Sequence, residues 1–193
     1  MDYVFNMWLG IVIISLIGTL AHFVYEWTGH HKIIGLFTAV NESTWEHIKI
    51  ALTPSLLWGL YDGLVFGSSP NYFLAKLLSL LIIVLLIPAI FYSYKAITKK
   101  DILIFDIIIF YLAIMVSQFV FYIVLMLSPV PYPLQYLSCL GLFIFFGCYM
   151  TLTLEPLKTF LFKDPTNGKY GFRAHTDLFK KIKSKVKKPK SKK

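Results

Sequence analysis

Two short stretches, residues 22–31 and 41–47, hold the side chains best suited to chemistry. His22 and Glu26 are four residues apart, as are Glu42 and Glu46, so each pair would share one face of a helix. We expect the two stretches to form one polar cluster that consists of His22, Glu26, Asn41, Glu42, Glu46 and His47. Imidazole and carboxylate groups together suit a divalent transition metal, and the candidate ligands are His22, Glu26, Glu46 and His47.

Three interpretations of this cluster remain open. A bound metal with a carboxylate beside its water would support hydrolysis, although the chain has no HExxH or spaced Cys/His motif. The cluster could instead bind a solute. The third interpretation is structural: residues 43–46 match the S-x-x-E capping box, and Glu42 and Glu46 would lie at the positive end of a helix dipole.

Aromatic and histidine residues nearby also have a structural interpretation. Trp27 and Trp45 match the aromatic belt found where membrane helices meet the headgroups. His30 and His31 follow Gly29 in a short connection, and we expect both imidazoles to be solvated there.

The elements that must position these residues are strongly apolar. Of the 193 residues, 57% are hydrophobic and 15% charged, whereas soluble domains have about 45–50% apolar and about 25% charged residues. A helix rises 1.5 Å per residue, so about 20 apolar residues cross a hydrocarbon core of about 30 Å. We predict an all-α, polytopic membrane helical bundle with about five transmembrane helices, at residues 4–27, 43–67, 71–97, 102–127 and 133–160.

The lysines predict the orientation of this bundle. The connections at 67–71 and 128–133 carry no Lys or Arg, whereas Lys32, Lys95, Lys99 and Lys100 lie in or beside the other two connections. The positive-inside rule then places the N-terminus outside and the C-terminus in the cytoplasm. The segment 4–27 lacks the basic start and the cleavage site of a signal peptide, so we interpret it as a retained helix.

Prolines and glycines inside the predicted spans indicate where helices bend and meet. Pro54 and Pro88 each remove a backbone donor, and a kink of this kind either serves packing or lines a substrate cavity. Helix packing is expected along Gly59, Gly63 and Gly67, which repeat every fourth residue. We favour a partner helix from the same chain, while a second copy in an oligomer is the alternative.

Charged side chains inside a span are costly, at about 2.5–3.5 kcal/mol each on insertion scales. Asp62 and Lys76 lie at equal depth on two antiparallel helices, so we predict an intramembrane ion pair between them, with an ion or proton path as the alternative. Gln118 is expected to make an interhelical polar contact. Cys139 and Cys148 would face opposite sides of one helix and are expected to stay unpaired.

Residues 163–193 are expected to form a cytoplasmic unit after the bundle of residues 1–162. Turn residues between 162 and 171 could fold back near Glu42 and Glu46. Residues 180–193 contain nine lysines and no acid, and an apolar stripe of Leu178, Phe179, Ile182 and Val186 favours a helix in the headgroup plane. We expect this tail to bind anionic lipid headgroups and not nucleic acid.

Three motifs together resemble a known family of small bacterial integral membrane proteins of unknown function. They are His22-Phe23-Val24-Tyr25-Glu26-Trp27, Val40-Asn41-Glu42-Ser43-Thr44-Trp45-Glu46-His47, and Phe162-Lys163-Asp164-Pro165 followed by Gly168-Lys169-Tyr170-Gly171. The resemblance covers about residues 10–172, excludes the lysine-rich tail and implies no activity. It places the chain in a bacterial cell membrane as a multi-pass protein.

The sequence therefore leaves three functions in competition. We rank a non-catalytic or accessory membrane component first, a small-solute or ion transport component second, and a membrane-embedded metal-dependent hydrolase third. The cofactor is unknown, with a divalent metal as the candidate.

Overall fold

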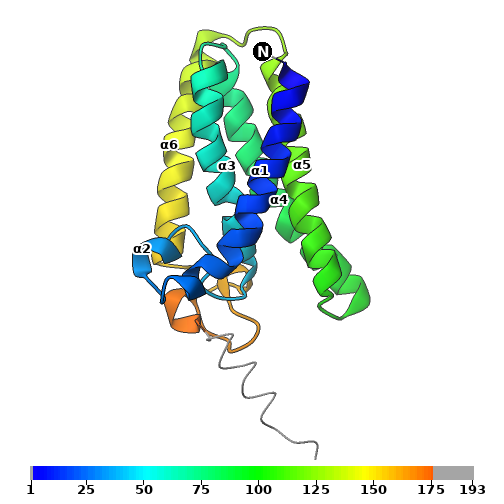
Figure 1. The fold of residues 1–193 in the computed structure, drawn as a ribbon, viewed down its shortest axis with the longest axis vertical. Coiled ribbons are helices and arrows are strands. Elements are labelled where there is room, and N and C mark those ends of the chain that lie inside the picture. The colour runs from blue at the N-terminus through cyan, green and yellow to red at the C-terminus, as the bar shows by residue number, and fades with distance from the viewer. Residues whose placement is uncertain (1, 176–193) are drawn as a thin grey trace, which may run out of the picture.

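Five long helices form the body of the protein, as the computed structural model, which describes residues 2–175, shows (Figure 1). The long helices are α1 (Tyr3–Trp27), α3 (Thr44–Phe66), α4 (Tyr72–Thr98), α5 (Leu103–Leu125) and α6 (Tyr132–Leu154); the short ones are α2 (Lys32–Gly35), η1 (Phe160–Phe162) and η2 (Gly171–Ala174). Of the three short helices in the described part, one lies between α1 and α3 and two follow α6. The all-α class predicted from the sequence is thus observed.

Helix ends follow local chemistry. α1 begins after Asp2, whose carboxylate accepts hydrogen bonds from the backbone N–H groups of Val4 at 2.9 Å and Phe5 at 3.3 Å. The prediction that the last span is helical to residue 160 is wrong, because α6 ends at Leu154. Pro156 disfavours the helical conformation of Glu155, which has φ −126° and ψ 78°.

Four of the helices are long and apolar enough to cross a membrane: α1, α4, α5 and α6. These four candidate spans suggest a multi-pass membrane protein. α3 is less apolar because it carries Glu46, Lys49 and Asp62 in addition to the proline and glycines along its length. The passage of α3 through the bilayer, and with it the count of five spans, stays a prediction.

The outer faces of the bundle are apolar, as expected for surfaces in contact with lipid. Leu64 is 90% exposed and Ile97 82% exposed, and large apolar side chains are exposed along α1, α5 and α6. Monomeric soluble proteins rarely expose so extensive an apolar surface.

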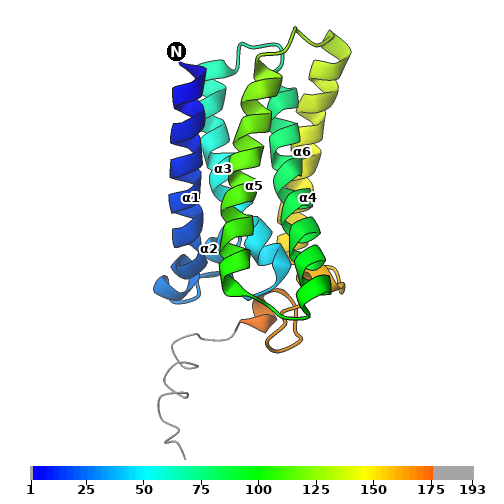
Figure 2. The same cartoon turned by 90° about the vertical axis from the view of Figure 1, so that its right-hand side faces the viewer.

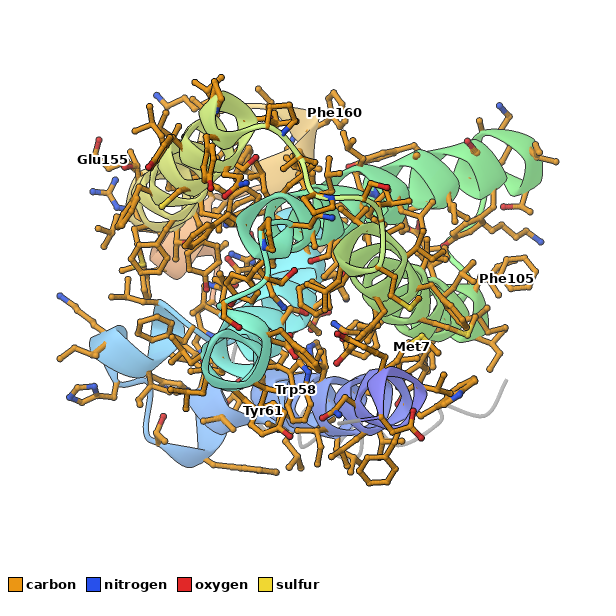
Figure 3. All side chains as sticks on the ribbon, turned by 90° about the horizontal axis from the view of Figure 1, so that it is seen from above. Met7, Trp58, Tyr61, Phe105, Glu155 and Phe160 are labelled. Carbon is orange, nitrogen blue, oxygen red and sulfur yellow. The ribbon has the colours of Figure 1, made fainter. Side chains whose placement is uncertain are left out.

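α3 lies within the bundle, in contact with α1, α4 and α5. The long helices run side by side (Figure 2), and in the view from above Trp58 and Tyr61 of α3 point toward α1 (Figure 3). Tyr61 donates a hydrogen bond to Asn6 of α1 at 3.0 Å. On the other side of α1, Met7 packs in a buried cluster with Phe121 and Tyr122 of α5.

α1 and α3 come closest where Pro54 interrupts the hydrogen bonds of α3. A Cβ atom placed on Gly18 of α1 would lie 2.6 Å from the carbonyl oxygen of Ile50. That oxygen is the acceptor that Pro54, which has no N–H, leaves unused within the helix. The proline therefore serves helix packing here, which was one of the two predicted interpretations.

One end of the bundle gathers most of the irregular structure, and we call it the basal end. It contains α2, the start of α3, the connection between α4 and α5, and residues 155–175, and it lies at the bottom of Figures 1 and 2. All the predicted cluster residues lie at or near this end.

Candidate functional site

Two of the sequence motifs interlock at the basal end. Asn41 donates a hydrogen bond from Nδ2 to the carbonyl oxygen of Gly171 at 3.0 Å, while its Oδ1 accepts one from the backbone N–H of Ser43 at 2.8 Å. The N–H of Glu42 donates to Asp164 Oδ2 at 3.3 Å. The expected return of the C-terminal segment to the region of Glu42 is therefore confirmed.

Asp164 shapes the turn that makes this contact possible. Its side chain is buried, and its Oδ1 accepts hydrogen bonds of 2.6 Å from both the N–H and the hydroxyl of Thr166. Its backbone N–H donates to Lys169 at 2.9 Å, and Gly168, with φ 72°, completes the turn. Asp164 thus joins the two motifs while it stabilises its own loop.

A buried ion pair joins α2 to α3. Lys49 Nζ lies 2.7 Å from Glu46 Oε2 and donates a hydrogen bond to the carbonyl oxygen of Gly35 at 2.8 Å. The same Glu46 oxygen accepts a hydrogen bond from the N–H of Val40 at 3.0 Å. The spacing of three residues between Glu46 and Lys49 is the sequence signal for this pair, although Lys49 was not among the predicted cluster residues.

The predicted capping box at Ser43 does not form. The Ser43 side chain makes no capping hydrogen bond, and its N–H pairs with Asn41. The Glu46 carboxylate is drawn instead to Lys49 and Val40.

His22 and His47 face each other across α1 and α3, with 5.8 Å between ring centroids. His47 Nδ1 lies 3.0 Å from the carbonyl oxygen of Ser43, and because a carbonyl only accepts, Nδ1 carries the proton. His22 Nδ1 is buried and has no hydrogen-bond partner among residues 2–175.

Glu26 contacts two histidines that the predicted cluster did not contain. Its Oε2 lies 3.1 Å from His30 Nε2, and its Oε1 lies 3.4 Å from His175 Nε2. His31 is exposed, as expected, and His30 is partly exposed but also contacts Glu26, which was not expected. The four-residue spacing between Glu26 and His30 is the sequence signal for the contact between them.

The structure does not bring the four predicted metal ligands into one group. Glu46 is engaged by Lys49, His22 faces His47, and Glu26 lies with His30 and His175. Within the described chain, the side chains close enough to share a metal ion are Glu26, His30 and His175, whose ligand atoms lie within 4.8 Å of one another.

A cleft of about 590 Å³ opens at the basal end between the start of α3, the end of α4, the start of α5 and residues 160–166. Its deeper part is apolar and lies between α4 and α5. The apolar lining includes Ile87, Phe91, Ile109 and Phe110. The charged side chains of the lining lie nearer the ends of the helices, beside the apolar Leu103 and Phe160, so the lining changes from apolar to mixed along the helix axes.

The polar part of the cleft holds groups of both signs: the carboxylates of Glu42, Asp101 and Asp106, the ammonium groups of Lys95 and Lys163, and His47. Lys95 pairs with Asp101 at 2.6 Å, and Tyr94 donates a hydrogen bond to Asp106 at 2.5 Å. The Glu42 carboxylate makes no hydrogen bond or ion pair with another side chain among the described residues. Glu42 and His47 are therefore the predicted cluster residues that reach the cleft.

Nearer the opposite end, the structure brings Asp62 and Lys76 together in a buried pair, with Oδ2 and Nζ 2.6 Å apart. Lys76 also lies 4.1 Å from the ring centroid of Phe121, and Tyr122 donates a hydrogen bond of 3.4 Å to Asp62. Each charge has its counter-charge beside it.

Two glycines of α3 face α4 at or near this pair. Cβ atoms on Gly59 and Gly63 would lie 3.4 Å from Lys76 and 3.1 Å from Tyr72, both in α4 of the same chain. Gly67 instead lies after the end of α3, is exposed, and has only atoms of Gly63 as its nearest neighbours. The packing face thus contains two of the three predicted glycines.

Gln118, the two cysteines and the C-terminal tail were the other features predicted from the sequence. Gln118 is buried, and its side-chain oxygen has no hydrogen-bond partner among the described residues. Cys139 and Cys148 are both free. The apolar stripe of the tail lies outside the described residues.

Comparison with known proteins gives one match. Residues 3–172 match the model of a family described as "Family of unknown function (DUF6512)". No curated protein and no solved structure matches the chain.

Proposed function

We propose, for a chain that belongs to the DUF6512 family of unknown function, a non-catalytic role in which the basal cleft binds a phospholipid with an amine-bearing headgroup. The observation that carries this proposal is the change in lining along one cavity, from the buried Ile109 and Phe110 to the more exposed Glu42 and Lys163. An amphiphile has the same order of groups along its length.

The volume of the cleft fits this class of ligand. About 590 Å³ lies within the range of roughly 300–1,000 Å³ typical of small-molecule sites. This space holds a headgroup and the upper part of the acyl chains, while the rest of each chain stays in the bilayer.

The charges favour a zwitterionic headgroup over an anionic one. The carboxylate of Glu42 is available to an ammonium group, because the Lys95 and Asp101 side chains already pair with each other. The Lys163 ammonium, which also lines the cleft, would meet the phosphate. A purely anionic headgroup has no ammonium group to pair with Glu42.

We further propose that the protein lies in a bacterial cell membrane with the N-terminus outside and the basal end in the cytoplasm. The lysines near span ends support this orientation, and α3 would then be the fifth span. The cleft would open at the depth of the cytoplasmic headgroups, and the lysine-rich tail would contact anionic lipids beside it.

Native mass spectrometry of the detergent-purified chain tests the cleft. Phosphatidylethanolamine and phosphatidylglycerol with identical acyl chains are titrated separately. We expect one phosphatidylethanolamine per chain to be retained in preference to phosphatidylglycerol. Glu42→Gln should weaken its binding on the order of 10- to 100-fold, because a hydrogen bond to a charged group contributes about 1.5–3 kcal/mol.

Glu155→Gln is the matched control, since Glu155 is an exposed carboxylate at the basal end that does not line the cleft. It should leave lipid binding unchanged. Equal retention of both lipids by the wild type, or an equal loss in both variants, would refute the proposed ligand.

A further inference from the structure

The side chains of Glu26, His30 and His175 come together at the basal end. Glu26 and His30 are four residues apart, whereas His175 comes from the far end of the described chain. Glu26 belongs to the last turn of α1, His30 lies in the following connection with φ 66°, and His175 follows η2. Their ligand atoms approach within 4.8 Å of one another. This group is separate from the basal cleft, whose lining contains none of the three.

Hydrogen bonding fixes which nitrogen of His175 faces the group. His175 Nδ1 lies 2.9 Å from the carbonyl oxygen of Val40, and a carbonyl oxygen only accepts hydrogen bonds, so Nδ1 carries a proton. In neutral imidazole the other nitrogen, Nε2, then presents a lone pair. This lone pair is directed at the Glu26 carboxylate, whose Oε1 is 3.4 Å away.

Two acceptors that face each other need a proton or a cation between them. His175 Nε2 is buried and has no hydrogen-bond partner among the described residues. Either an added proton on His175 or a metal cation would resolve this arrangement. The second possibility matches a general pattern, in which a metal-bound histidine donates its other ring N–H to a backbone carbonyl.

The distances agree with metal coordination. Zinc binds histidine nitrogen and carboxylate oxygen at about 2.0–2.2 Å in a tetrahedral arrangement, which places neighbouring ligand atoms about 3.3–3.6 Å apart. The two contacts of Glu26, at 3.1 and 3.4 Å, are close to this range. Only small side-chain shifts would be needed to accommodate the ion.

The surroundings leave a route for the ion. The His30 side chain is 39% exposed, whereas the Glu26 side chain is 8% exposed. The Tyr25 ring packs edge-on against His175, with 5.0 Å between centroids, and covers the inner side of the group. The group is therefore open toward solvent through His30.

We propose that Glu26, His30 and His175 bind one divalent transition metal ion, with Zn²⁺ as the best match. Two imidazoles and a carboxylate leave a fourth position for water. The ion would join the end of α1 to residue 175 and so hold the C-terminal segment, which also supplies Lys163 and Thr166 to the cleft, against the basal end.

Zinc binding to the full-length, EDTA-treated chain in detergent tests the site. Isothermal titration calorimetry, with metal analysis after desalting, should give one Zn²⁺ per wild-type chain. Glu26→Gln, His30→Asn and His175→Ala should each weaken zinc binding by at least about 10- to 100-fold. Losing a group that only hydrogen-bonds a metal ligand already has an effect of this size, and losing the ligand itself should have a larger one. Asn tolerates the left-handed conformation of residue 30, so His30→Asn keeps the backbone.

His31→Ala is the matched control, because His31 is the exposed neighbour of His30 outside the group. It should bind zinc like the wild type. Substituting Co²⁺ for zinc gives a readout independent of affinity, since the visible absorption of a four-coordinate site should appear in the wild type and in His31→Ala only. A wild type without stoichiometric zinc, or His30→Asn protein that is folded and binds zinc normally, would overturn the proposal.

Discussion

The side-chain amide of Asn41 donates a hydrogen bond of 3.0 Å to the carbonyl oxygen of Gly171, 130 residues further along the chain. Both residues are buried. Because the same amide also accepts from the N–H of Ser43, a single side chain holds the start of α3 and the C-terminal segment in one arrangement. The cleft and the Glu26 group both depend on that arrangement, since each includes residues from the C-terminal segment.

Replacing Asn41 by alanine should therefore destabilise the basal end. The Gly171 carbonyl and the Ser43 N–H would lose their buried partner, which costs about 1–3 kcal/mol for each unsatisfied group. Thermal unfolding of the detergent-purified variant should show a lower Tm. Lys158→Ala, at an exposed position, is the control and should stay within about 0.5 kcal/mol of the wild type. An Asn41→Ala Tm equal to that of the control would show that this contact contributes nothing.

The approach of Gly18 to Ile50 gives a second prediction. Gly18→Ala would place a methyl group 2.6 Å from a backbone oxygen, so α1 and α3 must separate, at a cost of about 1–3 kcal/mol. Gly147→Ala in α6 is the matched control, because a Cβ there meets nothing within 4 Å. In that open position alanine should be neutral or stabilise the helix by up to about 1 kcal/mol. Gly18→Ala should thus lower the thermal stability in detergent, whereas Gly147→Ala should leave it unchanged or raise it. Equal shifts in the two variants would contradict the close approach.

Local features of the chain were predictable from its sequence, whereas features that distant segments build together were not. The starts and ends of α1, α4 and α5 follow from apolar runs bounded by polar turns, and the depths of Asp62 and Lys76 follow from counting residues along antiparallel helices. The capping box failed because Lys49, one turn further on, competes for Glu46. The contact between Glu26 and His175 was missed for a different reason: His175 reaches Glu26 only through the fold of residues 155–175, which no periodicity reveals.

The Asp62–Lys76 pair should be more sensitive to the loss of one partner than to the loss of both. Asp62→Asn leaves the Lys76 ammonium buried without its counter-charge, and breaking a buried pair in this way costs about 3–5 kcal/mol. The double variant Asp62→Asn/Lys76→Met removes both charges and should recover most of the lost stability. Unfolding curves for the wild type, both single variants and the double variant form a cycle that measures the coupling. A double variant no more stable than Asp62→Asn would show that the two charges do not stabilise each other.

The orientation and the passage of α3 are tested by the same labelling experiment. In a background with Cys139 and Cys148 replaced by serine, single cysteines are placed by Ser68→Cys, after α3, and by Lys100→Cys, between α4 and α5. If α3 crosses the bilayer and the lysines lie in the cytoplasm, a membrane-impermeant maleimide added to intact cells should label residue 68 and spare residue 100 until the cells are permeabilised. Because α4 spans in either case, labelling of residue 100 but not 68 would reverse the proposed orientation of α4. A tag at the N-terminus then decides whether α3 crosses the bilayer. If residue 68 and the tag are both outside the cell, α1 and α3 both cross. If residue 68 is outside and the tag is inside, only α1 crosses.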